Sequence, residues 1–166
     1  MSWKILTRNL LTRPANPALR AKLARASTKK LGRALRIRHV AAGSCNGCEL
    51  ELRATQNLIH DLTQYGLRFT PSPRHADILL ITGVAGRNML EAVRQTRAAM
   101  PDPVLVVAVG DCAVDGGVFK TSPMVSGGAD AILPVDLVIP GCPPTPAQII
   151  EGLVGLLGLL GLLERV

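Results

Sequence analysis

Short apolar runs alternate with amphipathic segments from about residue 35 onward. Three of the runs, within the stretches ILLIT, VLVVAV and LVI, are apolar almost without interruption. Runs of this kind are typical of parallel strands that are covered on both faces of a sheet. The five predicted strands are Ile37–Ala42, Leu67–Thr70, Asp77–Thr82, Val104–Val109 and Leu137–Ile139.

Three segments have the spacing of amphipathic helices. Apolar residues recur at every fourth position from Leu50 to Leu62, and Gly66 follows as a stop signal. The last helix has Thr145 as a favourable N-cap and Pro146 in its first position. The predicted helices are Glu49–Tyr65, Asn88–Met100 and Pro146–Leu163.

Strands that alternate with helices predict right-handed crossovers and one parallel sheet. The 166 residues suffice for a single hydrophobic core. We therefore predict an α/β domain with a short parallel sheet at residues 36–166, preceded by an N-terminal arm at residues 1–35.

The charge distribution sets this arm apart from the domain. Residues 1–38 contain 11 of the 19 lysines and arginines and no acidic residue, whereas all 12 acidic residues follow them. A basic arm suggests nucleic acid, but the chain has one Trp, one Tyr and two Phe and no recognised nucleic-acid-binding module. We expect no nucleic-acid partner. A docking arm, a transit segment and an unstructured tail remain open readings.

All four cysteines follow predicted strands. Cys45 and Cys48 come after the first strand in a CxxC pair, Cys112 follows the fourth strand and Cys142 follows the fifth. Because ligand sites of parallel sheets form at the carboxyl ends of the strands, we expect the four thiols to converge on one edge.

Several chemistries compete for these thiols. A redox dithiol leaves Cys112 and Cys142 unexplained, and a structural zinc site normally has two short CxxC knuckles. Disulfides are disfavoured because no secretory signal is recognisable. Four buried structural thiols are disfavoured too, because all four cysteines lie at predicted strand ends beside glycine or proline. A [4Fe–4S] cluster accepts thiolates from scattered loops and needs close approach of backbone N–H groups, which neighbouring glycines permit. Six glycines flank the cysteines: Gly43, Gly47, Gly110, Gly116, Gly117 and Gly141. The candidates for that approach are Gly43, Gly47, Gly110 and Gly141.

Three other polar residues lie near the cysteines in the predicted fold. Asp111 and Asp115 flank Cys112, and we expect them to shape its loop rather than to take part in chemistry. His39 lies in the first strand, where contact with the surroundings of the cysteine site is a hypothesis.

Two stretches of the chain resemble a known family. "GDCAVDGGVF" and "VSGGADAILPVDLVIPGCPPTPAQIIEGLVGLL" are similar to the subunit shared by respiratory complex I and the membrane-bound, energy-converting [NiFe] hydrogenases, and the resemblance extends over residues 36–163. It implies a flavodoxin-like three-layer fold and one [4Fe–4S] cluster, with Cys45, Cys48, Cys112 and Cys142 as ligands. The CxxC spacing resembles the hydrogenase branch, because the complex I subunit typically has two adjacent cysteines here. Glu51 matches an acidic residue of both branches that is implicated in proton movement or partner contact.

The resemblance also implies a role and partners. It indicates an electron-transfer subunit of a formate hydrogenlyase-like [NiFe] hydrogenase complex, with its single cluster next to the Ni–Fe site of a large subunit. The implied partners are that large subunit, a ferredoxin-like iron–sulfur subunit and integral membrane subunits contacted by the arm. The implied location is peripheral, on the cytoplasmic side of the cell membrane. The alternative is the same role in a complex I-like assembly that reduces quinone or a sulfur compound.

Overall fold

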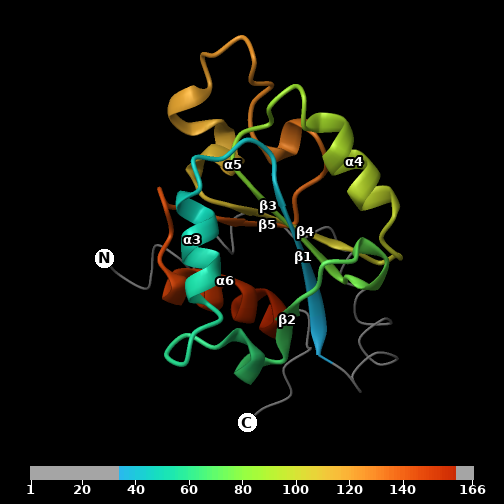
Figure 1. The fold of residues 1–166 in the computed structure, drawn as a ribbon, viewed down its shortest axis with the longest axis vertical. Coiled ribbons are helices and arrows are strands. Elements are labelled where there is room, and N and C mark those ends of the chain that lie inside the picture. The colour runs from blue at the N-terminus through green and yellow to red at the C-terminus, as the bar shows by residue number, and fades with distance from the viewer. Residues whose placement is uncertain (1–33, 160–166) are drawn as a thin grey trace.

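The computed structural model describes residues 34–159. Its centre is a sheet of five parallel strands in the order β2-β1-β3-β4-β5 (Figure 1). This order is that of the flavodoxin-like folds, and the α/β prediction is confirmed. The strands are β1 (Leu35–Ala41), β2 (Leu67–Phe69), β3 (Ile78–Thr82), β4 (Leu105–Val109) and β5 (Leu137–Ile139).

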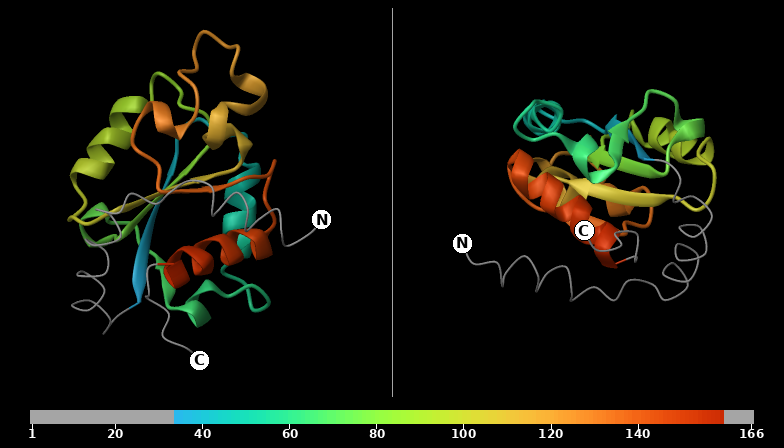
Figure 2. Two further views of the ribbon diagram at one scale, coloured as in Figure 1. Left: turned by 180° about the vertical axis from the view of Figure 1, so that it is seen from behind. Right: turned by 90° about the horizontal axis from the view of Figure 1, so that it is seen from below.

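Helices cover both faces of the sheet, which gives three layers (Figure 2). On one face, α3 (Gly47–Ala54) and α6 (Pro146–Leu159) pack on side chains such as Leu80 and Val107. On the other face, α4 (Leu90–Ala98) and the short α5 (Asp111–Asp115) pack on Leu79 and Val106. Every residue of β3 and β4 is buried, as their continuous apolar sequences predict.

The prediction of one helix at Glu49–Tyr65 is wrong in its second half. The α-helix α3 ends at Ala54, and only a 3-10 turn, η1 (Leu62–Tyr65), follows. Polar side chains compete for the backbone here: Thr55 Oγ1 donates to the Leu52 carbonyl, and Asn57 Oδ1 accepts from two backbone N–H groups. The apolar residue Leu58, which belonged to the predicted helical face, is 99% exposed.

The other boundaries differ less. The predicted helix Asn88–Met100 appears as the shorter α4, and Leu35, placed in the arm by the sequence, belongs to β1. The rest of the arm lies outside the described residues, as does the predicted end of the last helix. None of the helices that the structure describes has the length and apolar character needed to cross a membrane.

The start of α6 is fixed by a reciprocal cap, as the sequence predicts. The backbone N–H of Gln148 donates to Thr145 Oγ1 at 3.4 Å, and the Thr145 N–H donates to Gln148 Oε1 at 2.9 Å. This capping box satisfies N–H groups that have no partner inside the helix. It also sets where α6 begins relative to Cys142, three residues earlier.

We predict that Thr145→Ala weakens this helix start by about 1 kcal/mol. Amide hydrogen exchange in the first turn of α6 should then become about fivefold faster if local opening limits it. Thr145→Ser keeps the hydroxyl and serves as the matched control. Equal exchange in both variants would show that the cap contributes nothing measurable.

Candidate functional site: four thiols at one edge of the sheet

The structure brings all four cysteines to the carboxyl edge of the sheet. Cys45 lies in the turn after β1 and Cys48 in the first turn of α3, whereas Cys112 is the second residue of α5, after β4, and Cys142 follows β5. Cys48 is buried, Cys112 is half-buried, and Cys45 and Cys142 are exposed. None is in a disulfide. The convergence that the sequence predicts is therefore present.

A pair of hydrogen bonds ties the loops of Cys112 and Cys142 together. The Asp111 N–H donates to the Gly141 carbonyl at 2.9 Å, and the Gly141 N–H donates to Asp111 Oδ1 at 2.8 Å. Asp115 shapes the following turn, because its Oδ1 accepts from the Gly117 N–H at 2.9 Å. Both aspartates thus bind backbone within this region, as expected for loop-forming residues.

Glycines leave room directly beside the thiols. A Cβ on Gly110, whose φ is +88°, would lie 2.5 Å from Cys48 Sγ. One on Gly117 would lie 3.1 Å from Cys112 Sγ, and one on Gly47 would lie 3.6 Å from Cys45 Sγ. Gly117 was not among the four glycines singled out from the sequence.

The other two predicted glycines face other groups. A Cβ on Gly43 would first meet Val84, and one on Gly141 would first meet Pro144. Only Gly47 and Gly110 of the predicted set therefore open space next to a sulfur atom.

The electrostatics of the site disfavour a redox dithiol. Burial, the charge of Glu49 and the other three thiols raise the pKa of Cys48 to about 11. Burial and the neighbouring thiols also raise the pKa of Cys112. A reactive dithiol needs a thiolate at neutral pH and hence a lowered pKa. The thiols of Cys48 and Cys112 therefore keep their protons at neutral pH until a cationic centre binds them, and that binding releases the protons.

The donor set fits an iron–sulfur cluster better than a single ion. Within residues 34–159, no three Cys, His, Asp or Glu side chains are close enough together to hold one metal ion. In a [4Fe–4S] cluster each thiolate binds a different iron atom, so the sulfur atoms lie farther apart than around one zinc ion. Four thiols on one edge, with glycines beside three of them, are the kind of donor set that such a cluster takes.

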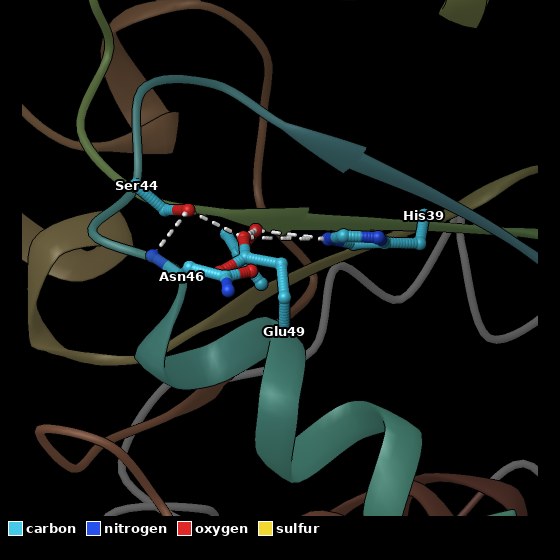
Figure 3. Close-up of polar contacts among 5 residues, drawn as sticks. His39, Ser44, Asn46 and Glu49 are labelled. Carbon is cyan, nitrogen blue, oxygen red and sulfur yellow. Dashed lines mark hydrogen bonds and ion pairs between the residues drawn. The ribbon is translucent and has the colours of Figure 1, made fainter.

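A polar network next to Cys48 was not predicted from the sequence (Figure 3). Glu49 Oε1 accepts a hydrogen bond from Ser44 Oγ at 2.6 Å and another from Thr82 Oγ1 at the end of β3. His39 Nε2 lies 2.9 Å from Thr82 Oγ1 and 3.8 Å from Glu49 Oε1. The Asn46 N–H donates to Ser44 Oγ at 3.3 Å. Of its members, only His39 was singled out from the sequence, by the hypothesis that it contacts the surroundings of the cysteine site; Ser44, Glu49 and Thr82 were not.

The protonation states in this network follow from its hydrogen bonds. Burial acts to raise the pKa of Glu49, but the donors Ser44 and Thr82 outweigh it, so the pKa lies below its ordinary value. Burial lowers the pKa of His39 despite the attraction of Glu49. The Thr82 hydroxyl donates its hydrogen bond to Glu49. The Thr82 oxygen is therefore the acceptor in the contact with His39, and His39 Nε2–H is the donor. The network therefore pairs an ionised Glu49 with a neutral His39 at neutral pH.

Glu51 and an apolar loop border the site. Glu51 lies half-buried on α3, one helical turn after Cys48. The loop after α5 carries three exposed apolar side chains, Val118, Phe119 and Met124. This loop projects from the same end of the molecule as α5 (Figure 1).

Residues 45–156, which include all four cysteines, match the family model described as the NADH ubiquinone oxidoreductase 20 kDa subunit. The chain belongs to this family. Membership confirms the resemblance drawn from the sequence motifs, and members of this 20 kDa subunit family are subunits of oxidoreductase complexes.

Two similar proteins come from hydrogen metabolism. The chain is 44% identical over 126 residues to the probable membrane-bound hydrogenase subunit mbhJ of Pyrococcus furiosus, covering 76% of this chain and 75% of that protein. It is 44% identical over 124 residues to formate hydrogenlyase subunit 7 of Escherichia coli, covering 75% of this chain. It spans only about half, 49%, of that subunit.

A solved structure supports the fold in the same family. A chain of the membrane-bound sulfane sulfur reductase, an archaeal respiratory membrane complex, superimposes with a TM-score of 0.70 at 29% identity. The match covers 82% of this chain and 75% of the other. The fold of this chain thus also occurs in an archaeal respiratory membrane complex.

Proposed function

We propose that this chain is the electron-transfer subunit of a membrane-associated [NiFe] hydrogenase complex of the formate hydrogenlyase type. The observation that carries the proposal is the set of four thiols at one sheet edge in a member of the 20 kDa subunit family. The CxxC spacing of Cys45 and Cys48 and the 44% identity to a probable membrane-bound hydrogenase subunit favour the hydrogenase branch.

In this proposal Cys45, Cys48, Cys112 and Cys142 hold one [4Fe–4S] cluster. Such a cluster, when bound, takes up and releases single electrons. The protein fixes the four thiolates through the strand ends, brings backbone close through Gly47 and Gly110, and limits water on the Cys48 side by burial. Gly43 and Gly141 shape the two cysteine loops.

The proposed partners follow from the number of cysteines and from the exposed apolar side chains of the loop after Cys112. Since the chain has four cysteines, all used for one cluster, electrons must come from or go to other subunits. We assign a large subunit with the Ni–Fe site and a ferredoxin-like subunit to these roles. The exposed side chains of Val118, Phe119 and Met124, on the loop after Cys112, suit burial against one of them.

Two finer assignments come with this proposal. Glu51 moves protons or contacts the large subunit at the border of the site. The basic arm attaches the chain to membrane subunits on the cytoplasmic side of the cell membrane.

The test is anaerobic purification of the complete complex. We expect hydrogen evolution with a reduced dye, about four iron and four sulfide per copy of this subunit beyond the clusters of the others, and nickel in the large subunit. Cysteine pairs suited to nickel ligation in the large-subunit gene would agree. Zinc in place of iron in this subunit would contradict the electron-transfer role.

The second candidate is a complex I-like assembly that reduces quinone or a sulfur compound. It is favoured by the family model and by the match to the sulfane sulfur reductase. A purified complex that lacks nickel and hydrogen evolution but reduces one of these acceptors would select it.

A further inference from the structure

Glu49 joins the cysteine turn to the sheet. Its carboxylate accepts from Ser44, which lies next to Cys45, and from Thr82, which ends β3. Since Glu49 itself follows Cys48, one side chain connects both halves of the CxxC turn to a strand that is buried along its whole length. Ser44 also accepts from the Asn46 N–H, so the turn is braced on both sides of Cys45.

The charge of Glu49 has no cationic partner among residues 34–159. Its one ion-pair contact in that part of the chain is His39, at 3.8 Å, and burial lowers the pKa of His39, so the imidazole is neutral at neutral pH. Neither arginine near it in sequence forms an ion pair with Glu49 in the described part of the chain: Arg53, four residues on in α3, is exposed, and Arg38 donates to the Pro71 carbonyl at 2.8 Å. The Glu49 side chain is 12% exposed, so water screens its charge poorly.

We propose that Glu49 is a positioning residue that braces the Cys45–Cys48 turn and places beside Cys48 a negative charge that no cation among residues 34–159 neutralises, which lowers the reduction potential of the cluster. This inference rests on the proposed function, since it concerns the cluster that the four thiolates hold. Reduction adds one electron, supplied by a reduced iron–sulfur partner, and neither forms nor breaks a bond in this chain. A nearby negative charge disfavours that added electron, so the potential falls.

The two roles of Glu49 are separated by two substitutions. Glu49→Gln keeps an oxygen that accepts from Ser44 and Thr82 but removes the charge. We expect the complex to keep its cluster and the midpoint potential to move to a more positive value. Glu49→Asp keeps the charge on a shorter side chain, so we expect lower cluster content, a broadened signal and an unshifted potential.

The measurement is an EPR redox titration of the purified complex. The signal of this subunit is identified as the part that disappears in Cys112→Ser. Glu91→Gln is the matched control, because it removes the same charge from an exposed position on α4, on the other face of the sheet, and should leave the potential unchanged.

The outcomes separate this inference from the proposed function. An absent [4Fe–4S] signal in the wild-type complex overturns the proposed function and the inference with it. A present signal whose potential is the same in wild type and Glu49→Gln overturns the inference alone. A positive shift in Glu49→Asp as large as that in Glu49→Gln also overturns it, because the charge would then not be the cause.

Discussion

Cys112→Ser is expected to remove the cluster signal of this subunit and to reduce hydrogenase activity of the whole complex by roughly two orders of magnitude or more. Loss of a residue that only supports a metal ligand typically lowers metal affinity or activity 10–100-fold. We expect the loss of a ligand itself to lower both by more. The seryl oxygen is a weaker ligand for iron than the thiolate it replaces. The measurements are EPR of the reduced complex and dye-linked hydrogen evolution.

Thr121→Ser, at an exposed position in the loop after α5, is the control for this experiment. It should leave signal and activity at the wild-type level. A Cys112→Ser complex that keeps the full signal and full activity would show that the ligand assignment is wrong. Assembly of the variant complex is checked by its subunit content, so that loss of the cluster is not confused with loss of the chain.

Gly110→Ala is expected to lose most of the cluster while the chain still folds. The added Cβ would lie 2.5 Å from Cys48 Sγ. A free thiol at the end of a side chain rotates away from such a contact, but a sulfur bound to iron is held in place. The contact therefore weakens binding of the cluster rather than folding of the chain. We expect roughly a 10–100-fold fall in the cluster-dependent activity.

The backbone strain at Gly110 is separated from this clash by a second glycine. Gly66 also has a positive φ, of +72°, and a Cβ there has no neighbour within 4 Å; its ψ of 23° places it in the left-handed helical region, whereas Gly110 has ψ of 152°. Gly66→Ala should cost about 1–2 kcal/mol of stability from strain alone and keep its cluster. Equal cluster loss in the two variants would mean that strain, and not contact with Cys48, explains the effect. Iron content and amide exchange in β4 make the comparison.

The sheet was predictable because the sequences of its central strands are continuously apolar, which is typical of buried parallel strands. The buried runs at Ile78–Thr82 and Leu105–Val109 are apolar along their length, and no other element explains such runs between helices. The helix after Cys48 was predicted too long because Leu58 fits a helical face by spacing. The side chains of Thr55 and Asn57 decide otherwise through hydrogen bonds that spacing does not reveal.

The position of the cysteines was predictable for a similar reason, since parallel strands share a carboxyl edge. The Glu49 network was not. It depends on the register that places Ala41 of β1 beside Thr82 of β3, and on the turn that brings Ser44 back to Glu49. Neither the register nor the course of this turn can be derived from the sequence before the pairing of the strands is known. The roles of Cys45, Cys48, Cys112, Cys142 and Glu51 stay predictions for the experiments above.

The order in which the four thiols leave the ribosome follows from their placement after β1, β4 and β5. Between Cys48 and Cys112 lie 63 residues, and 29 more separate Cys112 from Cys142. During synthesis the nascent chain first exposes a dithiol, then three thiols, and completes the set only after β5 has been made and paired with β4. In the proposed function, the full set of four cluster ligands therefore exists only after Cys142 has been synthesised, near the end of the domain.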